Sequence, residues 1–259
     1  MIENRTKQRL AAGDTVIGCF LRYSNATLAE FVALGGWDFV VFDAEHGTLQ
    51  ARDLEDLSRA CELHGVTPIV RATANEPSTI LRFLDAGAHG VQVPWVESGA
   101  AAEAAVQAAK YQPRGNRGLA ATRSAGFGVP APIGEYTQQS NAETLVVVQV
   151  ESAEGVANVG DLVAIDGVDV IFIGPTDLAH SLGHVGDADH PEVQAAMTQI
   201  ADVVVASDKA LGIFVANPAE ALAWNERGAR YLATGLEPLL SKSMHNYLET
   251  VRRTEGAAQ

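Results

Sequence analysis

Eight short runs of apolar, mostly β-branched residues recur along the 259-residue chain, and alanine-rich or amphipathic stretches separate them. This alternation is typical of strand–helix units that build a parallel sheet. The runs expected to form strands are Val16–Leu21, Phe39–Asp43, Thr67–Arg71, Gly90–Val93, Leu145–Glu151, Val168–Ile173, Leu211–Val215 and Tyr231–Leu236. Eight such units predict an α/β fold in which residues 1–259 form a single closed (β/α)₈ TIM barrel.

The intervening stretches supply the helices and the longer connections of this barrel. Expected helices include Ala26–Leu34, Ala51–His64, Pro77–Asp85 and Ser98–Lys110. An open, doubly wound sheet is the alternative, but the first strand is not followed by GxGxxG, and eight units exceed what that fold usually uses. Two long connections, residues 111–132 and 181–190, interrupt the regular pattern. We expect the first to be an active-site loop or an inter-subunit loop, because such loops in compact domains are usually functional or disordered.

Charge and cysteine content narrow the classes of partner. The chain has 18 Lys plus Arg against 32 Asp plus Glu, a formal net charge of −14, which disfavours binding to nucleic acid or to an anionic membrane surface. Cys19 and Cys61 are the only cysteines and form no CxxC pair, so neither a disulfide framework nor a zinc site is expected. Apolar runs of signal-peptide or membrane-spanning type are absent, which favours a cytoplasmic protein.

Two acids lie at the ends of consecutive predicted strands. Glu151 closes the fifth run, and Asp177 follows the sixth run after a Gly-Pro turn. Either acid alone would be read as a helix N-cap or a solvated loop charge. Together they provide the oxygen ligands that Mg²⁺ and Mn²⁺ prefer, with positions left for water and substrate. The pair therefore predicts a catalytic metal site at the carboxyl end of the barrel, where such barrels place their chemistry.

Arg71 ends a run that should be buried on both faces, so its guanidinium needs an anion. The anion is either an internal carboxylate or a keto-acid substrate whose carbonyl oxygen becomes an enolate, and the strand-end position favours the substrate. Asp43 and His46 share one tight turn after the second run, which predicts an acid–base dyad. Glu45, between them, has no assigned role.

Lysine and the remaining histidines are placed away from the predicted strand ends. No strand end supplies an amine for a Schiff base with a carbonyl substrate, because the lysines fall in N-terminal or helix-like segments: Lys7, Lys110, Lys209 and Lys242. Carbonyl activation is therefore expected to use a metal. Six histidines show no metal-ligand spacing and are expected mostly at the surface: His64, His89, His180, His184, His190 and His245.

Six segments distributed over nearly the whole chain resemble the HpcH/HpaI aldolase/citrate lyase family. This family contains metal-dependent (class II) pyruvate aldolases, among them the 4-hydroxy-2-oxoheptanedioate and 2-keto-3-deoxy-rhamnonate aldolases. The segments that carry the resemblance are Phe39–Gly47 (FVVFDAEHG), Pro68–Arg71 (PIVR), Phe83–Pro94 (FLDAGAHGVQVP), Tyr111–Gly118 (YQPRGNRG), Val148–Ser152 (VQVES) and Phe172–Gly183 (FIGPTDLAHSLG).

The resemblance implies a role for each residue that matches these segments. It implies that Glu151 and Asp177 bind a divalent metal (Mg²⁺, Mn²⁺ or Co²⁺), that Arg71 grips the pyruvate oxygen, and that His46 with Asp43 forms the base dyad. It also implies that Gln149 lies beside the metal and that the backbone at Gly174, Pro175 and Thr176 holds the pyruvate carboxylate. Phe20 would line the aldehyde pocket, and Asp85 would reach the site of a neighbouring subunit. Family members are typically hexamers, trimers of dimers that exchange their last helix.

The function expected from these residues and from the resemblance is an aldolase reaction. A 4-hydroxy-2-oxo acid would be cleaved reversibly to pyruvate, or a related 2-oxo acid, and an aldehyde through a metal-stabilised enolate, with oxaloacetate decarboxylation as a side activity. One alternative is a malyl-CoA or citramalyl-CoA-type lyase, for which the only basic cluster in view is Arg114, Arg117 and Arg123. The others are a sugar-phosphate isomerase or epimerase barrel and an inactive scaffold that binds keto acids.

Overall fold

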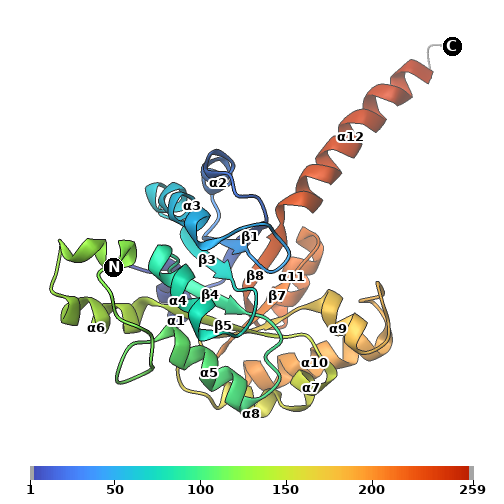
Figure 1. Ribbon diagram of the computed structural model, residues 1–259. Helices are drawn as coiled ribbons and strands as arrows, with labels where there is room; N and C mark the ends of the chain where they lie inside the picture. The colour runs from blue at the N-terminus through green and yellow to red at the C-terminus, as the bar shows by residue number, and fades with distance from the viewer. Residues whose placement is uncertain (1–2, 257–259) are drawn as a thin grey trace.

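A closed barrel of eight parallel strands forms the centre of the molecule, with helices around it (Figure 1). The structure is a computed structural model that describes residues 3–256. Each strand pairs with the next, and the last strand pairs with the first. The strands are β1 (Val16–Leu21), β2 (Phe39–Asp43), β3 (Thr67–Arg71), β4 (Gly90–Val93), β5 (Leu145–Val150), β6 (Val170–Ile173), β7 (Ala210–Phe214) and β8 (Ala229–Gly235). The predicted TIM barrel is confirmed.

The first four strands have the predicted bounds, and the last four differ by one or two residues at one or both ends. β5 ends at Val150, so Glu151 lies just beyond the strand rather than in it. β6 begins at Val170, and the carboxylate of the preceding Asp169 accepts a hydrogen bond from the backbone N–H of Val146 (2.8 Å) at the strand's start. Apolar periodicity does not detect this polar contact.

The helices agree with the predicted ones to within one residue where bounds were predicted, but they are more numerous than one per strand. Two helices follow β5 and two follow β6. The helices are α1 (Arg5–Ala11), α2 (Ala26–Ala33), α3 (Ala51–Leu63), α4 (Pro77–Ala86), α5 (Gly99–Ala109), the 3₁₀ helix η1 (Arg123–Gly128), α6 (Ile133–Glu143), α7 (Ala153–Ala157), α8 (Val159–Val163), α9 (Pro175–Ser181), α10 (Pro191–Val205), α11 (Pro218–Glu226) and α12 (Leu236–Gly256).

Aromatic side chains fill the interior of the barrel. The rings of Phe39 and Tyr231 stack with centroids 4.1 Å apart, and Phe172 meets Tyr231 edge-on at 5.8 Å. A Cβ atom at Gly18 would lie 2.1 Å from the Phe39 ring, so this position of β1 has room only for glycine. Because the interior is packed, it forms no pore, and an accessible site must lie at one end of the barrel.

The last helix leaves the barrel instead of packing along it. α12 projects from the end of β8 into solvent (red in Figure 1). Large apolar side chains along it are exposed, including Leu240, Met244, Tyr247 and Leu248. A helix with this much exposed apolar surface is unusual for a monomer.

Within residues 3–256, no helix is both long enough and apolar enough to cross a membrane. The cytoplasmic location stays a prediction.

Candidate active site

Most of the predicted site residues meet in one cavity at the carboxyl ends of the strands. The cavity has a volume of about 190 Å³ and receives side chains from β1, β3, β5, β6, β7 and the turn after β2. Its lining consists of Phe20, Arg22, His46, Arg71, Gln149, Glu151, Phe172, Gly174, Pro175, Thr176, Asp177 and Phe214. Two of the predicted site residues lie outside this lining: Asp43, which accepts hydrogen bonds from Arg71, and Asp85.

Glu151 is a buried carboxyl group, with 2% of the residue exposed. Its Oε1 accepts the backbone N–H of Trp95 (2.8 Å), and its Oε2 accepts the side-chain amide of Gln149 (2.6 Å). Burial raises the pKa of Glu151 to about 7, and the negative charges of Glu45 and Asp177 add to this, while the two hydrogen bonds oppose it. The group is therefore held in place without an ion-pair partner among residues 3–256.

A chain of hydrogen bonds across the barrel fixes the orientation of Gln149. The hydroxyl of Tyr231 donates to Oε1 of Gln92 (3.4 Å), the amide of Gln92 donates to Oε1 of Gln149 (2.5 Å), and the amide of Gln149 donates to Glu151. Each amide can donate only from its nitrogen, so the chain directs the NH₂ group of Gln149 toward the carboxylate. Gln149 thus lies beside Glu151, and its place next to a metal stays a prediction.

The segment that carries Asp177 approaches Glu151 closely. Gly174 precedes α9 and Pro175 is its first residue, which tolerates proline because that N–H has no partner inside the helix. A Cβ atom at Gly174 would lie 2.6 Å from Oε2 of Glu151, so glycine is required there. Asp177 then falls in the first turn of α9, where a negative charge is favoured.

The chemistry of this donor set fits a hard divalent cation. Glu151 and Asp177 offer carboxylate oxygens to the same cavity, and the negative charge of Asp177 raises the pKa of Glu151. A cation held by both would remove this repulsion and replace the missing counter-charge of Glu151. Thiolates, which select softer metals, are absent from this lining, because Cys19 and Cys61 are buried elsewhere, and His46 contributes the one imidazole of the lining.

Arg71 is bound by internal carboxylates and also faces the cavity. Its Nε and Nη2 donate to the two oxygens of Asp43 (2.9 and 2.6 Å), and Nη1 lies 3.2 Å from Oε2 of Glu45. Burial alone would raise the pKa of Asp43, but the hydrogen bonds and charge of Arg71 lower it below its usual value. The internal carboxylate that the sequence left open as a partner is therefore present, and the guanidinium is held rigidly at the cavity wall.

The structure differs from the expected contact between Asp43 and the imidazole of His46. One oxygen of Asp43 accepts the backbone N–H groups of Glu45 (3.1 Å) and His46 (3.2 Å), in addition to its bond from Arg71. Asp43 thus folds the turn and binds the arginine. The half-exposed imidazole has its Nε2 3.9 Å from a carboxylate oxygen of Glu45.

Two functional candidates, Trp95 and Arg22, were missed from the sequence, and a third, Glu45, was left without a role. Glu45 lies between Arg71 and His46, and burial raises its pKa, with Arg71 opposing the rise. Trp95 has the left-handed φ of +53° that non-glycine residues rarely adopt, and it donates its N–H to Glu151. Arg22 directly follows β1, with its Nε 3.5 Å from Asp43. The strand-end rule could have found Arg22 and Trp95, since each follows a strand closely.

Asp85 and the 111–132 loop lie away from the cavity. Asp85 is on α4 and accepts from Nη2 of Arg117 (2.6 Å). Arg123, in η1, pairs with Glu62 of α3 (2.6 Å). The loop is thereby held against α3 and α4 and contributes no lining residue to the cavity described here, so of the two roles predicted for it the active-site role does not hold within this chain.

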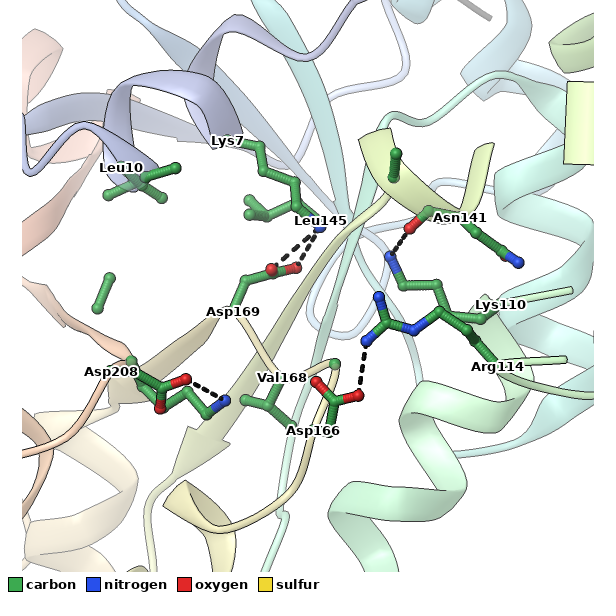
Figure 2. Close-up of a pocket in the computed structure, with 15 residues that line it drawn as sticks. Lys7, Leu10, Lys110, Arg114, Asn141, Leu145, Asp166, Val168, Asp169 and Asp208 are labelled. Carbon is green, nitrogen blue, oxygen red and sulfur yellow. Dashed lines mark hydrogen bonds and ion pairs between the residues drawn. The ribbon is translucent and has the colours of Figure 1, made fainter. Parts of the chain in front are cut away.

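A larger cavity, of about 340 Å³, lies at the amino end of the barrel, where Lys7, Lys110 and Arg114 face acidic residues (Figure 2). Its charges are paired internally: Lys7 with Asp169 (3.0 Å), Arg114 with Asp166, and Lys209 with Asp208. Lys110 donates to two backbone carbonyls, and burial lowers its pKa to about 7. We assign the chemistry to the smaller cavity, because it holds the uncompensated carboxylates.

Comparison with known proteins identifies the family. Residues 16–241 match the HpcH/HpaI aldolase/citrate lyase family. A 5-keto-4-deoxy-D-glucarate aldolase from Shigella boydii is 39% identical over 233 residues, which are 90% of each chain. The crystal structure of a family protein from Burkholderia cenocepacia J2315 is 36% identical, with a TM-score of 0.91 over 96% of this chain and 99% of that one.

A more distant structure shares the fold. The citrate lyase β subunit from M. tuberculosis, in a structure complexed with oxaloacetate and magnesium, is 17% identical with a TM-score of 0.56, over 87% of this chain and 93% of that chain. The match over residues 16–241 spans all eight strands and every residue of the cavity. The chain belongs to the HpcH/HpaI aldolase/citrate lyase family, and it is a carbon–carbon lyase of the class II aldolase type.

Proposed function

We propose that this cavity cleaves a 4-hydroxy-2-oxo acid reversibly to pyruvate, or a related 2-oxo acid, and an aldehyde, with Glu151 and Asp177 holding Mg²⁺, Mn²⁺ or Co²⁺. The observation that carries the proposal is the buried carboxyl group of Glu151. It faces Asp177 and has no ion-pair partner among the described residues, next to a rigidly held guanidinium. When bound, a divalent cation supplies Lewis-acid polarisation of a keto oxygen. The M. tuberculosis citrate lyase β subunit, which shares the fold, is complexed with magnesium and oxaloacetate, and this supports a divalent cation and a 2-oxo acid as the molecules bound here.

Arg71 serves as the donor to the keto oxygen on which negative charge develops. Asp43 and Glu45 hold the guanidinium in a fixed position before substrate arrives, so little reorganisation is needed during the reaction. The pyruvate carboxylate is held by backbone around Gly174, Pro175 and Thr176. Pro175 has no backbone N–H, and the N–H of Gly174 already donates to the carbonyl of Val150 (3.3 Å). The backbone donors left for the carboxylate are therefore the N–H groups of Thr176 and of the rest of the first turn of α9.

His46 moves the proton of the 4-hydroxyl group. Cleavage requires this hydroxyl to lose its proton as the carbon–carbon bond breaks, and the half-exposed imidazole at the cavity edge accepts it directly or through water. In the reverse direction His46 returns the proton as the enolate attacks the aldehyde. Phe20 and Phe214, whose rings lie 5.8 Å apart, form the apolar wall beside the aldehyde. Oxaloacetate decarboxylation passes through the same enolate and is proposed as a side activity.

The alternatives from the sequence have less support. A CoA thioester would need a free basic surface, but Arg114, Arg117 and Arg123 are paired with Asp166, Asp85 and Glu62. The family match is to aldolases and citrate lyases, which argues against a sugar-phosphate isomerase. An inactive scaffold is disfavoured because the carboxylates, guanidinium and imidazole of the cavity are all in place.

Removal of divalent cations is expected to abolish pyruvate release from a 4-hydroxy-2-oxo acid, because no described residue can replace the charge between Glu151 and Asp177. The assay couples pyruvate to a reporter enzyme that needs no metal, before and after dialysis against EDTA. Added Mg²⁺ or Mn²⁺ should restore the rate. Full turnover after rigorous chelation would remove the metal from the mechanism.

Ionisation of Glu151 is expected to destabilise the metal-free protein as pH rises. Burial raises its folded-state pKa to about 7 from the ordinary value of 4.5, so no penalty exists below about pH 4.5, and the penalty grows until about pH 7. Between those limits the wild type should lose up to about 3 kcal/mol more unfolding free energy than Glu151→Gln, which cannot ionise. Urea unfolding in EDTA at several pH values measures this difference. Identical pH dependence in the two proteins would contradict the assignment.

Replacement of His46 by alanine is expected to lower kcat by about 10²–10⁴-fold, the usual contribution of a general base. Metal affinity, measured by calorimetry, should stay unchanged because His46 is not proposed as a ligand. His64→Ala is the matched control, since that histidine lies outside the cavity at the end of α3. An unchanged kcat in His46→Ala would exclude the proposed proton transfer.

We propose that the chain forms a homohexamer, a trimer of dimers in which α12 packs on a neighbouring subunit and Asp85 faces a neighbour's site. The exposed apolar side chains of α12 support this. Light scattering should give about six times the 27.3 kDa chain mass. Met244→Asp should reduce this mass, whereas Asn246→Asp, at another exposed position of the same helix, should not. A monomeric wild type would refute the proposal.

A further inference from the structure

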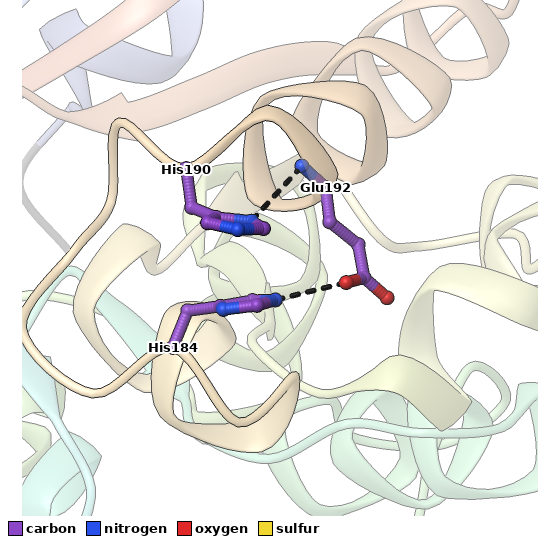
Figure 3. A group of neighbouring side chains, drawn as sticks. All are labelled: His184, His190 and Glu192. Carbon is purple, nitrogen blue, oxygen red and sulfur yellow. Dashed lines mark hydrogen bonds and ion pairs between the residues drawn. The ribbon is translucent and has the colours of Figure 1, made fainter.

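Three side chains able to bind a metal meet outside the active cavity, between α9 and α10 (Figure 3). His184 lies in the connecting loop, His190 precedes α10, and Glu192 is in its first turn. Nε2 of His184 is 2.8 Å from Oε2 of Glu192, and the two imidazole rings stack with centroids 3.4 Å apart and planes inclined by 16°. One potential ligand atom from each of the three residues lies within 4.8 Å of the others.

The loop backbone brings these residues together although their spacing follows no helical period. The N–H of His184 donates to the carbonyl of Ala179 (2.8 Å), and the N–H of Asp187 donates to the carbonyl of His184 (3.0 Å). The N–H of His190 then donates to the carbonyl of Asp187 (3.3 Å). These successive turns fold the chain back on itself, and Figure 3 shows the two rings lying one above the other with the Glu192 carboxylate beside them.

The hydrogen bonds indicate which atoms of the cluster an ion could use. Nδ1 of His190 accepts the backbone N–H of Glu192 (3.3 Å), so a lone pair of this nitrogen points out of the ring toward the start of α10. Nε2 of His184 and Oε2 of Glu192 are already in contact at 2.8 Å. Imidazole nitrogens and carboxylate oxygens are ligands that transition ions take in proteins.

We propose that His184, His190 and Glu192 form a second metal site, specific for a borderline transition ion such as Zn²⁺. Two imidazoles and one carboxylate are a ligand set that Zn²⁺ commonly takes, with the fourth position open to water. Mg²⁺ prefers the all-oxygen site of the active cavity, so the two sites differ in ligand type. Both histidines are partly exposed, so an ion can reach their rings from solvent.

The position of this site gives it a structural consequence. The loop it closes connects the end of α9, whose first turn carries Asp177, to the start of α10. An ion bound there links His184 to the first turn of α10 and restrains the loop. Zn²⁺ should therefore raise the thermal unfolding temperature of the protein through this site alone.

The test measures Zn²⁺ binding to the full chain by calorimetry in saturating Mg²⁺, and it involves no catalytic readout. We expect the wild type to bind one further equivalent of Zn²⁺ and to gain thermal stability. His184→Gln with His190→Asn should weaken this binding at least tenfold; asparagine is chosen because it preserves the N-cap of α10. Glu192→Gln, which leaves both rings in place, should also weaken binding.

His245→Gln is the matched control, because this histidine is exposed on α12 and contacts only Ser241 of the same helix among the described residues. It should bind Zn²⁺ as the wild type does. Co²⁺ offers a spectroscopic check, since a site with two nitrogen ligands and low coordination number should give visible absorption bands that the double variant lacks. Failure of the Mg²⁺-saturated wild type to bind Zn²⁺, or equal binding by the double variant and the wild type, would overturn the proposal.

Discussion

The burial of one negatively charged group, the carboxylate of Glu151, is the constraint around which the active end of the barrel is organised. An isolated buried carboxylate is costly, and hydrogen bonds from Trp95 and Gln149 offset this cost only in part, because the pKa stays near 7. The bound cation that we propose would complete the compensation. The folded chain thus stores an unfavourable charge arrangement that metal binding would relieve, and this relief would favour the binding of a cation.

The surrounding charges show why a further positive centre is needed. Four carboxylates lie in or against the cavity, from Asp43, Glu45, Glu151 and Asp177, and they face the guanidinium groups of Arg71 and Arg22. In a chain of net charge −14, an anionic 2-oxo acid would be repelled by this set. A divalent cation held there would bring the cavity close to neutrality, and the guanidinium of Arg71 could then act on the substrate as well as on its internal partners.

Strand positions and strand-end residues could be predicted because a barrel enforces a strict relation between sequence and space. A polar residue just after a buried strand lies at the carboxyl end of the barrel. This rule predicted that Arg71, Glu151 and Asp177 lie near one another, and all three line the same cavity. Hydrogen-bond partners do not follow from this rule. From the sequence, the carboxylate of Asp43 could bind either the guanidinium of Arg71 or the imidazole of His46. Only the structure shows that both of its oxygens accept hydrogen bonds from Arg71. The amide chain through Gln92 likewise depends on cross-barrel distances that periodicity does not encode.

The central claim is that Glu151 and Asp177 jointly hold a divalent cation to which a 2-oxo acid binds. Anomalous diffraction from crystals soaked with Mn²⁺ and oxalate, an analogue of the pyruvate enolate, tests it most directly. The account predicts one strong anomalous peak in this cavity, within bonding distance of both carboxylates and of the oxalate oxygens. A cavity without such a peak, or a Mn²⁺ ion that contacts neither acid, would contradict it.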